Sequence, residues 1–275
     1  MPLLYTVLIG LAAGAHSSTW GMYKDAPHEG FTWWKFFRST LFAAGVSVLV
    51  HQWLQPEAFT ASWLVVLFGV IYVVERAVAE VYKTFIRVQD QSKYTIPMQL
   101  AVLGRPVESY PVRLLVGAAY VGGALLVMTG VQAVQRANPA PALIVVLLLG
   151  AAGGWISAFG GAWKDAPIEG FQTLKFFRSP LMASFYAFVV GHFTTNLVVV
   201  ALAATGYVIM TTETYKTFFF PSKPRGKFQG KPVLFHDWLV KRQYFVPLYV
   251  AIWAVVIGAF VLAFSQPHTG LVNVF

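Results

Sequence analysis

The stretch Lys24-Asp25-Ala26-Pro27-His28-Glu29-Gly30-Phe31 returns in the second half of the chain as Lys164-Asp165-Ala166-Pro167-Ile168-Glu169-Gly170-Phe171. We call these two stretches the KDAP motifs. Further matches flank them in the same order. Residues 35–39 match residues 175–179, residues 80–85 resemble residues 213–218, and residues 104–107 resemble residues 230–233. This order indicates an internal duplication, with a first unit in residues 1–137 and a second unit in residues 138–275.

The composition indicates that the solvent of this chain is a lipid bilayer. Hydrophobic residues make up 57% of the 275 residues and charged residues only 11%, against roughly 25% charged residues in soluble domains. So few polar side chains cannot cover a water-exposed globule. The chain has no cysteine, which excludes disulfides, zinc–thiolate sites and thiol nucleophiles.

The hydropathy pattern predicts an all-α, polytopic integral membrane protein with about eight transmembrane helices. A span needs about 20 mostly apolar residues, and such stretches occur near residues 3–22, 38–54, 62–83, 112–134, 140–162, 180–197, 198–218 and 244–265. The boundary between the sixth and seventh spans rests on the polar residues between His192 and Asn196.

Basic residues fall in alternate connections between these spans. They follow the first, third, fifth and seventh spans, whereas the other connections hold little besides Arg136. Short basic loops stay in the cytoplasm, so we expect both termini outside and the protein in the plasma (inner) membrane. The net charge of +9 is then a topology signal and no indication of nucleic-acid binding.

Four spans per unit is an even number, so both units enter the membrane in the same direction. We therefore expect two parallel four-helix repeats about a pseudo-twofold axis along the membrane normal. The duplicated Gly10-x-x-x-Gly14 and Gly150-x-x-x-Gly154 spacings favour close helix packing, and we expect these helices near that axis.

The KDAP motif predicts an interfacial amphipathic helix. Asp25 is suited to the N-cap position, and helical winding places Phe31, Lys35 and Arg38 on one face. Aromatic anchorage with snorkelling cations, which also attract anionic lipids, accounts for the rings and the cations. The recurring carboxylates favour a second interpretation, an inner mouth framed by both copies: Lys24, Asp25, Glu29, Lys35, Arg38, Lys164, Asp165, Glu169, Lys175 and Arg178.

Acidic residues inside the spans are candidate ion- or proton-handling groups, because charges in a membrane are costly and usually face a partner or water. Glu75 and Arg76 lie deepest, while Glu80 and Glu213 lie near the cytoplasmic ends of their spans. The alternatives are a buried Glu75–Arg76 pair with a packing role, and local ion pairs of Glu80 and Glu213 with the lysines three residues on.

Histidines in the spans offer a further possibility. His51 and His192 occupy nearly equivalent positions in the two units, and paired histidines can ligate a haem or a pigment. The alternative is that they are hydrogen-bonded structural groups.

No motif of a hydrolase, zinc protease or P-loop enzyme is present, so no enzyme is expected. The first hypothesis is a transporter or channel for an ion or small anion, with a cytoplasm-facing polar site between the repeats. The alternatives are a non-catalytic subunit or scaffold of a larger membrane complex, and a lipid-handling protein. The partners we expect are other subunits of a membrane complex or further copies of this chain; a stoichiometric partner favours the second hypothesis, whereas a lone monomer or a homo-oligomer opposes it.

Overall fold

The computed structural model describes residues 2–221 and 226–272, and its regular elements are helices apart from one short hairpin of two strands. Lys223 and Arg225, two expected loop cations, lie outside the described residues. The elements are α1 (Pro2–Glu29), α2 (Trp33–Leu54), α3 (Ala61–Val81), η1 (Tyr82–Ile86), β1 (Ala101–Val102), β2 (Arg105–Pro106), α4 (Tyr110–Ala137), α5 (Leu143–Gly150), α6 (Ala152–Glu169), α7 (Thr173–Gly191), α8 (Leu197–Phe218), α9 (Trp238–Lys241), η2 (Arg242–Phe245) and α10 (Val246–Ser265).

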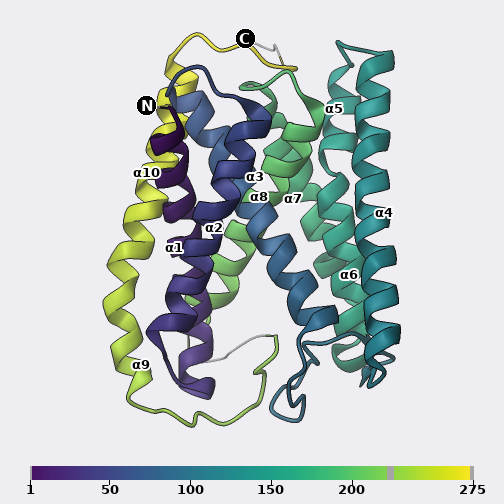
Figure 1. The fold of residues 1–275 in the computed structure, drawn as a ribbon, viewed down its shortest axis with the longest axis vertical. Coiled ribbons are helices and arrows are strands. Elements are labelled where there is room, and N and C mark those ends of the chain that lie inside the picture. Colours follow the sequence, from purple (N-terminus) through teal and green to yellow (C-terminus); the bar gives the residue numbers. More distant parts are fainter. Residues whose placement is uncertain (1, 222–225, 273–275) are drawn as a thin grey trace.

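Four helical segments are long and apolar enough to cross a membrane, which indicates a membrane protein. They are Tyr110–Ala137, Leu143–Glu169, Leu197–Phe218 and Trp238–Ser265. The other expected spans, 3–22, 38–54, 62–83 and 180–197, lie mainly on α1, α2, α3 and α7. The long helices run along one axis, with both ends of the chain at one end of the molecule and the long connections at the other (Figure 1).

The break between the sixth and seventh predicted spans is confirmed. Helix α7 ends at Gly191 and α8 begins at Leu197. The side chain of Asn196 caps α8 by accepting hydrogen bonds from the backbone N–H groups of Val198 (3.0 Å) and Val199 (3.2 Å). Capping of this kind satisfies donors that the first helical turn leaves free.

The predicted interfacial helix is wrong, and so is the N-cap role of Asp25. Asp25 and Pro27 continue α1 down to Glu29. The chain then breaks at Gly30, whose φ of 72° lies in the left-handed region. Thr32 caps the next helix by accepting from the N–H of Lys35, so Lys35 and Arg38 begin α2. Each KDAP motif is thus the end of one long helix and the turn into the next.

The duplicated glycines lie away from the contact between the units. Gly14 packs against the backbone of Thr40 and Ser39 on α2, and Gly154 packs against Ser179 and Ala183 on α7. The expectation that α1 and α5 lie together near a central axis is therefore wrong, because their small residues serve the hairpin within each unit.

Helices α3 and α8 make the central contact between the two units. A Cβ on Gly69 would lie 2.9 Å from the Cα of Ala203, and a Cβ on Gly206 would collide with the carbonyl oxygen of Gly69. These glycines therefore let the two backbones approach closely. The hydroxyl of Tyr207 on α8 donates to the carbonyl oxygen of Val65 on α3 at 2.7 Å.

The last helix of each unit packs against the other unit. Helix α10 lies beside α1 and α3 and contributes Ile252 and Val256 to the apolar cluster around Val65. Helix α4 lies at the opposite edge of the molecule (Figure 1), where Val131 packs with Val146 of α5 and Val200 of α8. The two units are thus interlocked, and neither completes its packing alone.

The close α3–α8 contact predicts that a larger side chain at Gly206 destabilises the protein. Gly206→Ala should lower the free energy of unfolding by about 1–3 kcal/mol, the usual cost of overpacking. Gly258→Ala is the matched control, because nothing lies within 4 Å of a Cβ there. Thermal unfolding of the detergent-purified protein measures both variants. Equal melting temperatures for Gly206→Ala and wild type would contradict this account of the contact.

Candidate functional site

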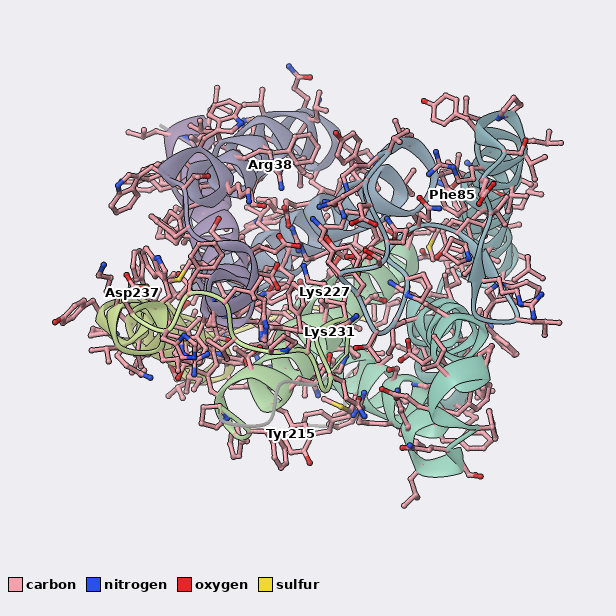
Figure 2. The ribbon with its side chains drawn as sticks, turned by 90° about the horizontal axis from the view of Figure 1, so that it is seen from below. Arg38, Phe85, Tyr215, Lys227, Lys231 and Asp237 are labelled. Carbon is pink, nitrogen blue, oxygen red and sulfur yellow. The ribbon has the colours of Figure 1, made fainter. Side chains whose placement is uncertain are left out.

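The charged residues of both units gather at the end of the molecule that carries the long connections, which we call the charged face. Seen from below, Lys227 and Lys231 lie near its centre, with Arg38 nearer the edge (Figure 2). Both KDAP motifs end at this face, as do α3 and α8. The side chains predicted for an inner mouth therefore share one end of the molecule, although they form separate groups there.

An ion pair joins the two units at this face. The Lys24 ammonium of α1 lies 3.4 Å from a carboxylate oxygen of Glu213 on α8, and Lys216 contacts the other oxygen at 3.2 Å. The side chains of Lys24 and Glu213 are each 14% exposed. A carboxylate so enclosed needs both cations, because an unpaired charge here would be strongly destabilising.

The equivalent ion pair, between Lys164 of the second unit and Glu80 of the first, is not formed. Glu80 on α3 is paired with Lys83 at 3.0 Å and is 52% exposed. Lys164, the counterpart of Lys24, lies near enough to attract Glu80 electrostatically. Its ammonium contacts the sulfur of Met98 at 3.8 Å, and it makes no ion pair within the described residues. The charged face is therefore asymmetric, enclosed around Glu213 and accessible around Glu80.

Glu29 lies at the centre of a second group of polar side chains. The sequence identified Glu29 but not this grouping. The Tyr94 hydroxyl donates to its carboxylate at 2.7 Å, and the ammonium groups of Lys93 and Lys227 lie at 3.7 and 4.0 Å. Burial alone would raise the pKa of Glu29, but the charge of Lys227 and the Tyr94 hydrogen bond outweigh it. The pKa therefore lies below its ordinary value of 4.5. Lys227 also pairs with Asp25 at 2.7 Å.

The connection from residue 226 to residue 237 crosses the first KDAP motif. His28 donates from Nδ1 to the carbonyl oxygen of Pro232 at 2.9 Å and stacks on Phe228 with ring centroids 4.4 Å apart. The backbone N–H of Leu234 donates to the carbonyl oxygen of Pro27 at 2.9 Å. This connection of the second unit is thereby fixed on the motif of the first unit.

The corresponding connection of the first unit lies on the second KDAP motif. Strands β1 and β2 form a short antiparallel hairpin. Its Ala101 carbonyl oxygen accepts from the Trp163 indole at 2.9 Å, and Gly104 lies against Pro167 and Ile168. The duplicated Gly-Arg/Lys-Pro-Val stretches are therefore docking segments, each placed on the other unit.

The second motif pairs its charges locally. Lys175 contacts Asp165 at 2.8 Å and Glu169 at 2.7 Å. These residues lie on neighbouring ends of α6 and α7, so the pairs stabilise the turn between them. The two copies of one motif thus use their carboxylates differently.

Three predicted residues stand apart from these groups. Lys35 and Arg38 are exposed on α2 and make no ion pair within the described part of the chain. Arg178 has a buried Nε with no hydrogen-bond partner among the described residues. Of the residues predicted to frame an inner mouth, Lys24, Asp25 and Glu29 form ion pairs with Glu213 or Lys227 of the other unit. An inner mouth framed by both motifs stays a prediction.

Glu75 and Arg76 form a buried pair deeper in α3. The Nε of Arg76 donates to the Glu75 carboxylate, and both side chains are less than one-tenth exposed. The guanidinium also lies over the ring of Trp20, 5.4 Å from its centroid. Each charge is compensated by its neighbour in the chain, which is the buried pair considered above as the alternative to ion handling.

A polar network continues from Trp20 toward the middle of the bundle. The Trp20 indole donates to the Tyr72 hydroxyl at 2.9 Å, and that hydroxyl lies 3.0 Å from Nδ1 of the fully buried His16. His16 stacks on Tyr249 with centroids 4.2 Å apart. Helices α1, α3 and α10 are thus joined by polar groups within the apolar bundle. The second unit has no equivalent of Trp20 or Tyr72, so the duplication could not have identified these two residues.

The two histidines considered for a cofactor lie toward the other end of the molecule. His51 lies 3.1 Å from the Thr6 hydroxyl, and His192 is buried among Phe188, Phe264 and His268. Across the described residues, no group of three or more His, Cys, Asp or Glu side chains is placed to hold a metal ion. A haem or pigment between His51 and His192 stays a prediction.

No family model, curated protein or solved structure matches this chain. Its function is argued from the site alone.

The lowered pKa of Glu29 predicts a pH-dependent contribution to stability. The folded state holds this carboxylate ionised more strongly than the unfolded state does. Its contribution is therefore complete above about pH 4.5 and is lost as the pH falls toward the folded pKa. The melting temperature of Glu29→Gln should lie below that of wild type at pH 7, and the difference should shrink below pH 4.5. A constant difference down to pH 3 would contradict the assignment.

Proposed function

We propose that this protein is a membrane transporter or channel for an ion or small anion, built from two parallel units of four membrane spans each. In this proposal the eight spans are α1, α2, α3, α4, the pair α5 and α6, α7, α8 and α10. The charged face is cytoplasmic, both termini are outside, and the membrane is the plasma membrane. The shared end of the two termini supports it, as does the grouping of the long connections at the other end (Figure 1).

The observation that carries the proposal is the asymmetry around the two equivalent glutamates. Glu213 is held by Lys24 of the other unit, whereas Glu80 is 52% exposed and Lys164 makes no ion pair with it within the described residues. The same pair of groups is thus closed on one side of the charged face and open on the other. Such a pair can open and close as the units move, and Glu80 is then the carboxylate that an ion meets first.

The packing between α3 and α8 explains why movement is required. Gly69 and Gly206 bring the helices together, and Phe68 and Tyr207 stack across the contact with centroids 6.3 Å apart. An ion crossing between the units requires this contact to shift. Rocking of two halves about a central contact is the usual motion of transporters built from repeats.

The same packed contact favours a second candidate, a non-catalytic subunit or scaffold of a larger membrane complex. A scaffold needs no passage, and close apolar packing between the units suits a rigid body. Ion pairs between the units are then structural locks. Flux measurement separates the two candidates.

The proposed topology predicts that two single-cysteine variants are labelled from the cytoplasmic side and two others from the outside. The chain has no cysteine, so single cysteines report without background. Arg105→Cys and Asp237→Cys should react with an impermeant maleimide from the cytoplasmic side. Asn138→Cys and Gln266→Cys should react from the outside, because these exposed residues directly follow α4 and α10, and both helices end at the opposite end of the molecule. Labelling of the first two positions from opposite sides would remove the parallel arrangement.

The transport part predicts loss of flux when a glutamate is neutralised. Protein in liposomes should pass a proton, potassium, chloride or phosphate. Glu80→Gln should lower that flux at least about tenfold, since losing roughly 1.4 kcal/mol of stabilisation slows a step by that factor. Glu75→Gln and Glu213→Gln test the other candidate groups in the same assay. Asp237→Asn is the control, because Asp237 is 56% exposed and its one ion pair among the described residues is with Lys241, one helical turn away.

Two outcomes would contradict this proposal, the first its mechanism and the second transport itself. Wild-type flux in Glu80→Gln and Glu213→Gln would remove these carboxylates from the mechanism. Absence of any flux in wild type, with a stoichiometric partner retained from native membranes in mild detergent, would favour the scaffold.

A further inference from the structure

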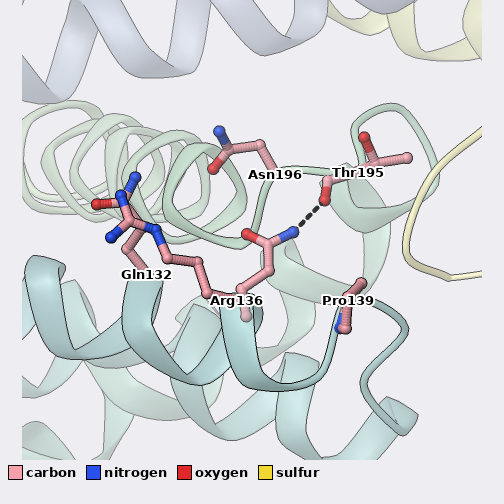
Figure 3. A pocket seen from close by; sticks show the side chains of 6 residues that line it. Gln132, Arg136, Pro139, Thr195 and Asn196 are labelled. Atoms are coloured by element: carbon pink, nitrogen blue, oxygen red, sulfur yellow. Dashed lines mark hydrogen bonds between the residues drawn. The ribbon is translucent and has the colours of Figure 1, made fainter.

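A polar depression lies at the end of the molecule opposite the charged face. Its volume is about 390 Å³, and it is lined by Gln132, Gln135, Arg136, Pro139, Thr195 and Asn196. It forms where the end of α4 meets the turn between α7 and α8 (Figure 3). Gln132 and Arg136 are four residues apart on α4 and therefore share one face of that helix.

Hydrogen bonds fix the walls of this depression. Gln135 donates to the carbonyl oxygen of Thr195 and accepts from the N–H of Leu197 at 2.8 Å. The side-chain oxygen of Asn196 is occupied by the first turn of α8, so its amide N–H groups remain. The groups left to face a ligand are the Asn196 amide, the Gln132 side chain and the guanidinium of Arg136.

The charge of the depression is positive and uncompensated. Arg136 makes no ion pair or hydrogen bond within the described residues, and it is the one lysine or arginine at the end of a helix or in a described connection on this side. The first turn of α8, with its positive dipole end, adjoins it. Several donors around a permanent cation favour an anion with oxygen acceptors, and a guanidinium matches phosphate geometry in particular.

The duplication does not account for these residues. Helix α10, which ends the second unit, has neither glutamine nor arginine in its last eight residues. The bias of basic residues toward the cytoplasmic side does not account for Arg136 either, since it lies at the other end. A specific role for this end of α4 is therefore indicated.

The surface below the depression suits acyl chains. Only 11% of the most apolar stretch of α4 is buried in the protein, and Leu125, Leu126 and Val134 are exposed along it. A phosphate at the helix end with hydrocarbon along the helix is the layout of a phospholipid. We propose that this depression binds the phosphate of an anionic phospholipid in the leaflet opposite the charged face, with its acyl chains along α4.

The test uses the full chain in detergent and reads the melting temperature from tryptophan fluorescence. The probes are dioleoyl-phosphatidylglycerol, dioleoyl-phosphatidylcholine and inorganic phosphate. Wild type should be stabilised saturably by phosphatidylglycerol and less by phosphatidylcholine. Arg136→Gln should raise the half-saturating concentration of phosphatidylglycerol roughly tenfold, as loss of a charge-assisted contact does. Arg105→Gln, an exposed arginine at the other end, should leave it unchanged.

Each other outcome counts against the proposal. Equal responses to phosphatidylglycerol in wild type and Arg136→Gln, or equal losses in Arg136→Gln and Arg105→Gln, would show that Arg136 only snorkels to the interface. Stabilisation by inorganic phosphate equal to that by the lipid would assign the depression to a free anion. If Arg136→Gln does not fold, Arg136→Lys keeps the charge without the planar fork, and it should weaken phosphatidylglycerol binding while retaining the preference over phosphatidylcholine.

Discussion

Where α3 and α8 cross, Gly69 and Gly206 bring two backbones closer than larger residues would permit. The apolar cluster around this crossing includes Val65, Phe68 and Tyr207. The same two helices carry Glu80 and Glu213 to the charged face. The crossing therefore sets how far apart the two glutamates lie and which cations of the other unit can reach them.

Around this contact each unit is packed against the other by its last helix, its long connection and its charged side chains. Their last helices pack on each other's bundle, and their long connections dock on each other's KDAP motif. Ion pairs such as Lys24–Glu213 and Lys227–Asp25 also join one unit to the other. Most of these side chains are well enclosed, so removing one partner leaves a poorly hydrated charge and costs more than the pair contributes. A movement between the units must therefore exchange charge partners and cannot simply separate them.

Much of the helical framework was predictable, because apolar stretches of span length are a strong signal. The break before Leu197 followed from the polar residues His192 to Asn196, whereas the arrangement of the chain as two equivalent repeats, inferred from the KDAP motifs, stays a prediction. The interfacial helix was wrong because helical periodicity in residues 31–38 does not distinguish a separate helix from the first turns of α2. Thr32 and Gly30 decide between them through a cap and a left-handed turn.

The sequence identified some of the residues that the structure brings together at the charged face. Lys24, Asp25, Glu29 and Glu213 were identified by duplication, yet their partners Lys227 and Tyr94 were not. Lys227 lies three residues before Gly230, where the first unit has Ala101, so the repeat carries no signal for it. The duplicated glycines pointed to close packing but not to its partner, since small residues fit any neighbouring helix. Only the folded chain shows that Gly14 meets α2.

The place of α10 has a consequence for how the protein is made. Ile252 and Val256 of α10 pack in the cluster around Val65 of α3, so α3 leaves the ribosome well before this packing partner. Until residues 246–265 enter the bilayer, the apolar and aromatic surface beside α1 has no protein partner, and the ring of His16 lacks Tyr249. Assembly of this part of the bundle therefore depends on the synthesis of residues 246–265, and a product that stops before them leaves this surface exposed in the membrane.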